Sequence, residues 1–521
     1  MPDVREHRAE ALPAAELQRR AISGSAWTVL HTLVSVPVAF AANAVVARTL
    51  GVSSYGHLAF LTASFALAVT FANFGFSTAF VQRGSRAEAG GRRLEADDLL
   101  RRSLGFHAVV ELPILLVIVL ALTRNDPAWV AVALLTAVVF TTCLSGGALS
   151  FTIENRTALA AQVSIALNVV LQGASVATAV ATRSSAAVWA VRTLIPALAL
   201  GINFLLLGRR RRRAAVHPRL PSGLGSAFWR YSLFSWASGL LALLVYSRSE
   251  VFLLQLLHKR EALGLFALAF GLSQVITAPA DAMLHPLLPA VSGLLSAWPE
   301  RALAAFERST RVSALIGGGT AATVIPTLVF AVPLIYGASF ASAAWLFVPL
   351  ALVSTFQSTS NPVLAFANAR QRGALIFKAT SAALVVDVIV AVALIPPFGA
   401  WGAVAANVAG QPVGLVWLAV TEPLALAHGP MGLVRLYRPF LLGSVIGGAS
   451  LLVGDVLQAS SAGLAAATAC GFGAALYLLA VRMTRTGLTI QDRDALVGAL
   501  AKPIQPWLSR LLAPITTPRV A

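Results

Sequence analysis

The chain has 521 residues, of which 57% are hydrophobic and 12% are charged, and its mean hydropathy is +0.78. Soluble domains carry about 25% charged residues. With half that fraction, the chain has too little charge to cover a water-facing surface, so the composition argues against a soluble domain anywhere in it.

Apolar runs divide the whole chain. Most are about 20 residues long, enough for a helix rising about 1.5 Å per residue to cross roughly 30 Å of hydrocarbon. They lack the alternating pattern of a membrane barrel, and open strands leave backbone groups unpaired in lipid. The sequence therefore predicts an all-α integral membrane protein with about 14 transmembrane helices, at residues 23–47, 57–80, 103–122, 129–150, 158–181, 187–207, 231–256, 263–287, 312–336, 343–366, 374–395, 402–427, 439–457 and 463–482.

The basic residues indicate the orientation. With the N-terminus placed inside, 32 of the 39 Lys and Arg residues fall on the inner side and 5 fall in the outer connections. Cytoplasmic loops carry an excess of Lys and Arg. The bias therefore predicts a multi-pass protein of the cell (inner or cytoplasmic) membrane with both termini in the cytoplasm.

The strongest basic feature is the run Arg209–Arg213 in a chain of net charge +18. Such runs are typical of nucleic-acid-binding proteins. This run directly follows an apolar segment on the inner side, so we favour contact with anionic lipid headgroups. We expect membrane lipids, and no nucleic acid, among the partners.

The sequence has no recognisable signal for catalysis or for a cofactor. It contains neither a G-x-x-x-x-G-K-[ST] loop nor a Cys/His spacing typical of metal sites. Cys143 and Cys470 lie in apolar runs and are expected to be buried free thiols. The short outer connections carry only Asp126 and Glu261 as acidic residues. We therefore expect no catalytic residue, no cofactor and no metal, and we disfavour an enzyme.

An internal repeat divides the spans. A shift of 208 residues places Gly56–Phe60 over Gly264–Leu268, and a shift of 216 places Arg156–Leu159 over Arg372–Leu375. Two parallel six-helix halves of this kind rock about a central site in transporters, although a duplicated scaffold without a transport role is the alternative. The predicted organisation is a tail (1–22), an N-terminal lobe (23–207), a basic connector (208–230), a C-terminal lobe (231–427), two extra helices (428–482) and a second tail (483–521).

Short motifs in residues 23–83 then indicate a family. A Gly-x-x-Trp entry is followed by Ala-Arg-x-Leu-Gly (47–51), Tyr-Gly (55–56) and Phe-Gly (74–75). This opening resembles that of the polysaccharide (oligosaccharide-lipid) flippases of the multidrug/oligosaccharidyl-lipid/polysaccharide exporter superfamily. In the second half, Ser-Arg-Ser-Glu-Val-Phe (247–252) stands where that family often has an acidic residue, with Glu250 in place of the commoner Asp.

The resemblance implies a function. Such proteins move a polyprenyl-diphosphate-linked oligosaccharide to the outer leaflet by alternating access, without nucleotide hydrolysis, for cell-surface polysaccharide biosynthesis. Expected partners are the lipid-linked oligosaccharide, membrane lipids and possible neighbours in the pathway, namely a polysaccharide polymerase and glycosyltransferases. For the two extra helices, the resemblance implies a lipid-facing or regulatory addition, or a groove for the lipid tail.

Charged residues within spans are the candidate site residues, because each costs about 2.5–3.5 kcal/mol at a helix centre. A diphosphate in the membrane requires fixed cations. We assign substrate binding to Arg48, Arg192 and Arg248, which fall toward the outer half. The alternative for each is a structural ion pair, or, for Arg48, a side chain that reaches to the interface.

Four acidic residues are candidates for ion coupling. A buried carboxylate can exchange a proton or bind a cation, which makes Glu250 and Asp387 the first candidates for ion coupling. Asp281 and Glu111 are further candidates. Carboxylates also favour a second function, a drug or cation antiporter of the same superfamily. The arginines of the outer half favour the flippase.

The orientation can be tested by thiol labelling. In a cysteine-free background, a cysteine at Ser222 should resist an impermeant reagent in intact cells, because the basic connector is predicted to be cytoplasmic. A cysteine at Ser184, in an outer connection, should react. The reverse pattern would contradict the predicted orientation.

Overall fold

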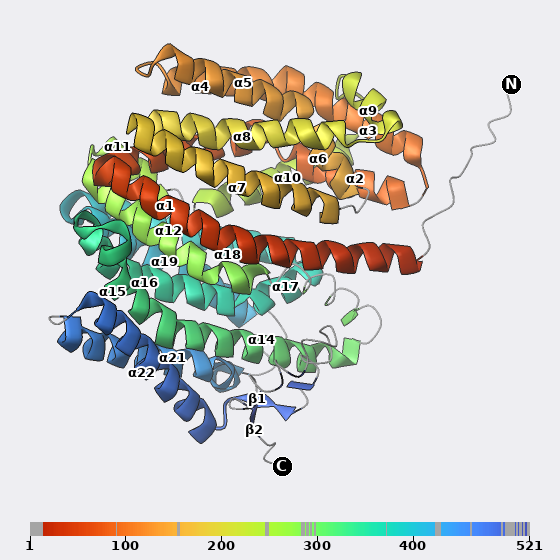
Figure 1. Ribbon diagram of the computed structural model, residues 1–521. Coiled ribbons are helices and arrows are strands. Elements are labelled where there is room, and N and C mark those ends of the chain that lie inside the picture. The colour runs from red at the N-terminus through yellow and green to blue at the C-terminus, as the bar shows by residue number, and fades with distance from the viewer. Residues whose placement is uncertain are drawn as a thin grey trace, which may run out of the picture. The chain divides into compact units, whose positions relative to one another are not determined.

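A computed structural model shows an almost wholly helical protein in two compact units, Met1–Leu244 and Val245–Ala521 (Figure 1). The structure describes residues 14–89, 91–153, 157–244, 249–282, 299–370, 372–421, 429–458 and 461–490, with scattered residues between 283 and 298 and after 490.

The first unit is a helical bundle whose third span contains a π-helical segment, η1. Its elements are α1 (Ala14–Asn73), α2 (Phe76–Ala89), α3 (Arg93–Phe106), η1 (His107–Glu111), α4 (Leu112–Leu122), α5 (Ala128–Leu144), α6 (Gly146–Ile153), α7 (Thr157–Thr182), α8 (Ser185–Leu205), α9 (Arg209–Val216) and α10 (Ser226–Leu243).

The second unit repeats this order and adds two helices, α21 and α22. Its elements are α11 (Ser249–Leu256), α12 (Arg260–Ala282), η3 (Pro299–Arg301), α14 (Ala302–Gly319), η4 (Thr320–Val324), α15 (Ile325–Tyr336), η5 (Ala338–Phe340), α16 (Ala341–Thr359), α17 (Asn361–Ala369), α18 (Gly373–Phe398), α19 (Ala400–Thr421), α21 (Gly429–Gln458) and α22 (Ala462–Met483), followed by the parallel strands β1 (Leu488–Thr489) and β2 (Thr516–Thr517).

Element boundaries in the two units correspond closely. The elements η1, α4 and α5 begin 213 residues before η4, α15 and α16, and α7 begins and ends 216 residues before α18. The turns that follow α7 and α18 both have positive φ, at Arg183 (49°) and Gly399 (56°). These offsets of 213 and 216 residues fall within the range of the two shifts found in the sequence, 208 and 216, and they support two related halves.

Two glycines of the sequence motifs mark breaks in the first unit. Gly51 has φ 73° and ψ 170°, so α1 is two helices joined at a kink. Asn43 and Tyr55 lie on either side of it and are hydrogen bonded at 2.9 Å. Twelve residues of straight helix would separate them by about 18 Å along the axis, so the chain turns sharply at Gly51.

The second break, at Phe74 (φ 47°) and Gly75 (φ 67°), ends α1. A Cβ on Gly75 would lie 2.2 Å from the carbonyl oxygen of Ser232 in α10. The Ser232 hydroxyl donates to the Phe74 carbonyl at 2.7 Å, and the Trp236 indole donates to the Phe71 carbonyl at 3.1 Å. The Phe-Gly motif therefore allows α10 to approach and pair the carbonyls that the broken helix leaves open.

The described residues contain twelve helices long and apolar enough to cross a membrane, against the fourteen predicted. The predicted span 23–47 falls within α1, whereas 57–80 begins in α1 and crosses the Phe74–Gly75 break into α2, so the two predicted spans yield one counted helix, Val34–Asn73. The span 231–256 is divided between α10 and α11 by residues 245–248, which lie outside the described part. The number fourteen and the lobe boundaries stay predictions. The prediction that Cys143 and Cys470 are buried is wrong, because both are exposed on the helix surface, although both are free.

The two added helices pack tightly on η4 and α14 through small residues. A Cβ on Gly443, Gly447 or Gly473 would lie 2.0–2.3 Å from a backbone oxygen of that span. The Tyr477 hydroxyl donates to the Leu315 carbonyl at 2.9 Å. Close approach through glycine is a common way for membrane helices to associate.

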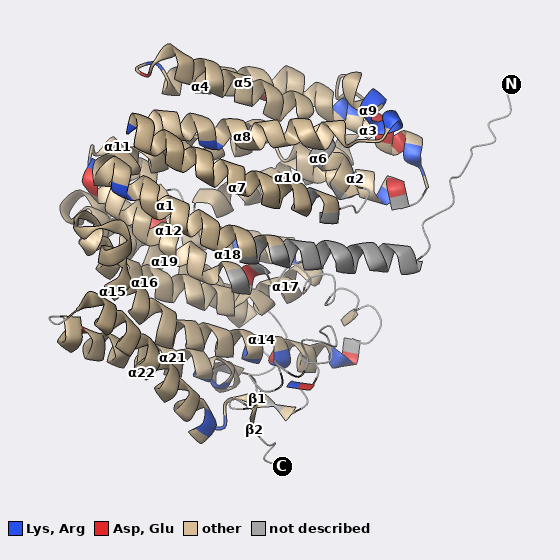
Figure 2. Ribbon diagram, in the orientation of Figure 1, with Lys and Arg blue, Asp and Glu red and all other residues tan. Residues whose placement is uncertain are grey.

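Charged side chains of the first unit gather at one end, on α2, α3 and α9 (Figure 2). Arg211 of α9 is 3% exposed and forms ion pairs with Glu88 of α2 and Asp97 of α3. Arg213 on the same helix is exposed. The basic run is thus more than the surface anchor that the sequence predicts, because one of its arginines joins three helices.

Arg211→Ala should destabilise the protein by about 1.5–3 kcal/mol, because Glu88 and Asp97 lose their buried partner and keep only the more exposed Arg93 and Arg210. Arg213→Ala is the matched control and should change stability by less than about 0.5 kcal/mol. Thermal unfolding of the purified protein in detergent measures both. Equal effects of the two substitutions would show that the Arg211 ion pairs contribute nothing specific.

Candidate functional site

Two acidic side chains, Glu250 of α11 and Asp387 of α18, lie together in the second unit. Both residues are fully buried. The Ser249 hydroxyl lies between them, 2.6 Å from Asp387 Oδ2 and 3.0 Å from Glu250 Oε2. In α19, Asn407 donates to Glu250 Oε1 at 3.0 Å, and Gln411 donates to Asn407 at 2.8 Å. The sequence named both carboxylates but gave no reason to bring them together.

The cluster has an excess of hydrogen-bond acceptors. Asp387 Oδ1 and Gln411 Oε1 are buried, and neither has a hydrogen-bond partner among the described residues. Gly410 allows the close approach of α18 and α19, since a Cβ there would lie 2.7 Å from Asp387 Cβ. Two adjacent carboxylates that cannot both ionise in a dry site are suited to hold a shared proton or a small cation.

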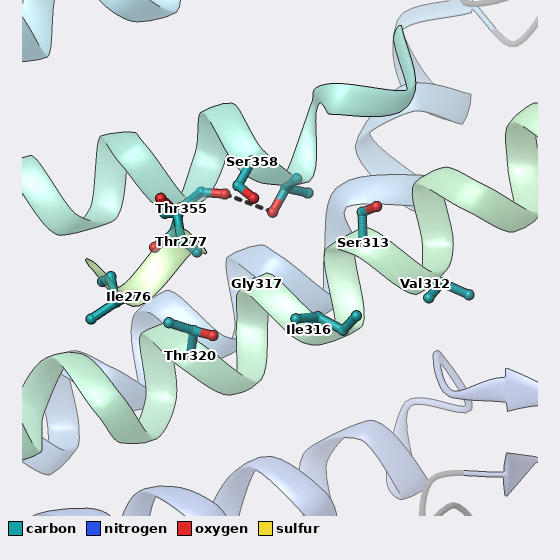
Figure 3. A pocket seen from close by; sticks show the side chains of 10 residues that line it. Ile276, Thr277, Val312, Ser313, Ile316, Gly317, Thr320, Thr355 and Ser358 are labelled. Carbon is teal, nitrogen blue, oxygen red and sulfur yellow. Dashed lines mark hydrogen bonds between the residues drawn. The ribbon is translucent and has the colours of Figure 1, made fainter. Parts of the chain in front are cut away.

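Asp281 lies at a different place in the same unit, at the end of α12. Its Oδ1 accepts hydrogen bonds from Ser358 of α16 (3.0 Å) and Asn361 of α17 (2.8 Å). Ser358 also lines a small cavity between α12, η4, α14 and α16 (Figure 3). Six hydroxyl side chains line that cavity, those of Thr277, Ser313, Thr320, Thr355, Ser358 and Thr359.

Glu111 is buried in the first unit, where it ends the π-helical segment η1. It contacts Nδ1 of His107 one turn earlier, and both residues are nearly inaccessible. Glu111 is one of the charged residues of the predicted spans, whereas His107 is not, because a neutral histidine adds no charge to an apolar run. The spacing of four residues on one predicted helix was the signal that could have found the pair.

The structure describes two of the three arginines assigned to substrate binding, and their surroundings differ. Arg192 of α8 is half-buried and donates to Asn43 Oδ1 of α1 at 3.4 Å. Asn43 in turn bonds Tyr55, so this arginine is tied to the residues that bridge the Gly51 kink. Arg48 is exposed near the end of the first half of α1. Arg248 lies outside the described residues.

Comparison with known proteins places this chain in a family. A sequence model described as "Polysaccharide biosynthesis protein" matches residues 21–294, more than half of the chain. The chain belongs to the polysaccharide biosynthesis protein family. No curated protein sequence matches it. The predicted family is thereby confirmed, and the chain is a multi-pass membrane protein of that family.

One solved structure shows the fold that this chain shares. The chain is similar to the structure titled "Lipid II flippase MurJ, inward closed conformation", with 12% identity and a TM-score of 0.59 over 87% of this chain and 97% of that one. It also matches the eukaryotic MATE transporter AtDTX14 (14% identity, TM-score 0.44, 86% and 100% coverage) and a MATE structure in the bent conformation (17%, 0.49, 78% and 96%). At such low identity, the first likeness shows the fold alone.

Binding of an ion or a proton at the Glu250–Asp387 cluster can be tested without a transport substrate. In wild type, a bound cation or proton should relieve the repulsion of Glu250 and Asp387 and so raise the thermal midpoint. At a ligand concentration 100 times the Kd, the folded protein should be stabilised by about 2.7 kcal/mol. The Glu250→Gln/Asp387→Asn variant should stay folded and lose the dependence on sodium, whereas Asp281→Asn should retain it. A midpoint that responds to sodium and pH equally in both variants and in wild type would rule the cluster out.

Proposed function

We propose that this chain is a flippase that moves a polyprenyl-diphosphate-linked oligosaccharide from the cytoplasmic to the outer leaflet by alternating access. The observation that carries the proposal is the family match over residues 21–294, which connects the chain to polysaccharide biosynthesis. The fold shared with a protein titled a lipid II flippase supports it. The expected partners, a polysaccharide polymerase and glycosyltransferases, belong to the same proposal.

The cargo requires a cation within the membrane. A diphosphate transferred into hydrocarbon without a counter-charge is very costly, and an arginine can donate to it through two parallel hydrogen bonds. Arg192 meets the requirement in part, because it is half-buried and held by the neutral amide of Asn43. No acidic partner of Arg192 is present among the described residues. We assign Arg192, Arg48 and Arg248 to the diphosphate.

Export against a gradient requires a source of energy, and the chain contains no nucleotide-binding loop. We assign ion coupling first to Glu250 and Asp387, whose shared burial and unpaired acceptor suit a cation or a proton. Asp281 and Glu111 are the second candidates. Asp281 already accepts two hydrogen bonds, which suits a structural role equally well.

A drug or cation antiporter is the second candidate function. The buried Glu250–Asp387 cluster favours it, because paired carboxylates attract cationic cargo as readily as they couple a driving ion. The two functions differ in what Arg192 contributes. A cationic drug gains nothing from an arginine in its path, whereas a diphosphate depends on it.

The leaflet distribution of lipid-linked glycan, measured at matched protein level, tests the flippase. Arg192→Lys should impair flipping and Arg192→Ala should impair it further, because the guanidinium is needed as a bidentate donor and not only as a charge. Arg248→Lys and Arg248→Ala should behave alike. Arg124→Ala, at an exposed arginine of an outer connection, is the control and should leave the distribution unchanged.

Two outcomes would contradict the assignments. Wild-type flipping by an Arg192→Ala/Arg248→Ala variant would end the diphosphate site and leave the family and fold untouched. A wild-type protein that leaves lipid-linked glycan on the inner leaflet of proteoliposomes, but exchanges an organic cation for sodium or protons, would replace the flippase by the antiporter.

A further inference from the structure

The same helix distortion occurs at equivalent places in the two units. The span α3–α4 contains the π-helical segment η1, and the span α14–α15 contains η4, 213 residues later and of equal length. In each span a proline is the second residue after the segment, Pro113 and Pro326. Proline cannot bond the carbonyl four residues earlier, and a π-segment accommodates this loss. The π-helical distortion is therefore common to both units. The residues that differ between η1 and η4 give the two segments different chemistry.

The two segments differ most at their ends. His107 and Glu111 begin and end η1, whereas Thr320 and Val324 occupy the same positions in η4. His107 is 3% and Glu111 4% exposed, and His107 Nδ1 contacts Glu111 Oε2. A π-segment thus requires neither a base nor an acid, and the first unit nevertheless buries both.

Two polar side chains, those of Asn73 and Ser77, lie next to the His107–Glu111 pair. The Ser77 hydroxyl lies 3.5 Å from Nε2 of His107, and Asn73 Nδ2 lies 3.5 Å from Glu111 Oε2 and 2.9 Å from the Ser77 hydroxyl. Asn73 and Ser77 come from the two sides of the Phe74–Gly75 break. The pair therefore contacts the point at which α1 ends and α2 begins.

Charged residues on the segments around η1 bear on its protonation. One is Arg219, whose carbonyl packs on Gly105, two residues before His107, and whose side chain pairs with Asp98. The neighbouring elements are α1, α3, α4 and α5, and α4 and α5 carry no acidic or basic side chain. In α3 the nearest is Arg102, about 7 Å from His107 along the axis, and it pairs with Asp98. His57 is the nearest in α1, sixteen residues before Asn73, and in α2 the nearest is Arg83, which is bound to the carbonyl of Leu224.

We propose that His107 and Glu111 form a proton-binding site of the first unit, separate from Glu250 and Asp387. Binding of a proton at His107 and Glu111 is coupled to the conformation of η1. The link to export rests on the proposed transport function. The proton site and its effect on η1 do not depend on it.

The proton balance follows from the contacts. A neutral imidazole bonded through Nδ1–H to the carboxylate carries a net charge of −1, and one further proton, taken from water onto Nε2, gives an imidazolium and a carboxylate with no net charge. The Ser77 hydroxyl can donate to Nε2 in the first state and accept from it in the second. Ser77 therefore offers Nε2 a partner before and after the proton arrives.

Burial makes this site conformationally sensitive. A net charge within the bundle is costly, so a conformation that buries the pair should favour its neutral, proton-bound form. The proton can leave when water reaches η1. By linkage, a conformation that hydrates the pair releases the proton, and removal of the proton favours that conformation. The break at Phe74–Gly75 gives the change a route into α1 and α2.

Two measurements on the purified protein in lipid nanodiscs test the site without any glycan. The first is the ¹⁵N spectrum of histidine, with the His107 signals assigned by their loss in His107→Thr. As the pH is lowered, wild-type His107 should gain a proton, and Glu111→Gln should abolish this change. The second is hydrogen exchange of the amides of residues 107–115, referred to residues 320–328, which form the equivalent segment without an ionisable pair.

The double variant His107→Thr/Glu111→Val takes its residues from the equivalent positions of the second unit, where a π-segment tolerates them. It should fold, retain the reference exchange of residues 320–328 and lose the pH dependence of residues 107–115. A wild-type His107 that stays uncharged throughout would overturn the proton site. A His107 that titrates while the relative exchange stays constant would overturn its coupling to η1. If wild type instead fails to flip glycan while both signals appear, the proposed function fails and the site remains.

Discussion

A polar side chain inside these helical bundles is costly unless it is paired within the protein, and this requirement helps to determine which helices are neighbours. Glu250 draws Asn407 of α19 to α11, Asp281 draws Asn361 to the end of α12, and Arg192 of α8 reaches Asn43 of α1. Apolar contacts alone distinguish poorly between one lipid-like helix face and another. The few polar contacts therefore specify the arrangement, and the same contacts are the candidate sites.

The backbone is subject to the same requirement. Where a helix breaks, the freed carbonyls need donors, and at Phe74 the donor is the hydroxyl of Ser232 on α10. Gly75 makes this possible because any side chain there would meet the Ser232 carbonyl. At the Gly51 kink the two parts of α1 are joined instead by their own side chains, through the Asn43–Tyr55 hydrogen bond. The two glycines thus mark helix breaks that are stabilised in different ways, by another helix at Gly75 and within α1 at Gly51.

The sequence was sufficient for properties that depend on one segment at a time. Run length and hydropathy predicted an all-α membrane protein, and the short motifs predicted its family. Contacts across the bundle were not accessible, because nothing local distinguishes Arg211, which is buried between Glu88 and Asp97, from exposed Arg213 in the same basic run. His107 was missed for a different reason, since a histidine in an apolar run carries no charge in a simple count.

The two units hold the same kind of distorted helix by different contacts. In the second unit, α21 and α22 cover η4, and Gly473 allows α22 within reach of the carbonyl of Ala322, which Pro326 cannot bond. Tyr477 fixes the preceding turn through the Leu315 carbonyl. The first unit has no counterpart of these helices in its sequence, and it places an ionisable pair at the ends of η1 instead. Packing of this kind is insensitive to pH, whereas a buried acid and base are not. The added helices α21 and α22 thus stabilise η4 by contact, whereas η1 depends on the protonation of its ionisable pair. Two segments of the same geometry are therefore deformed under different conditions.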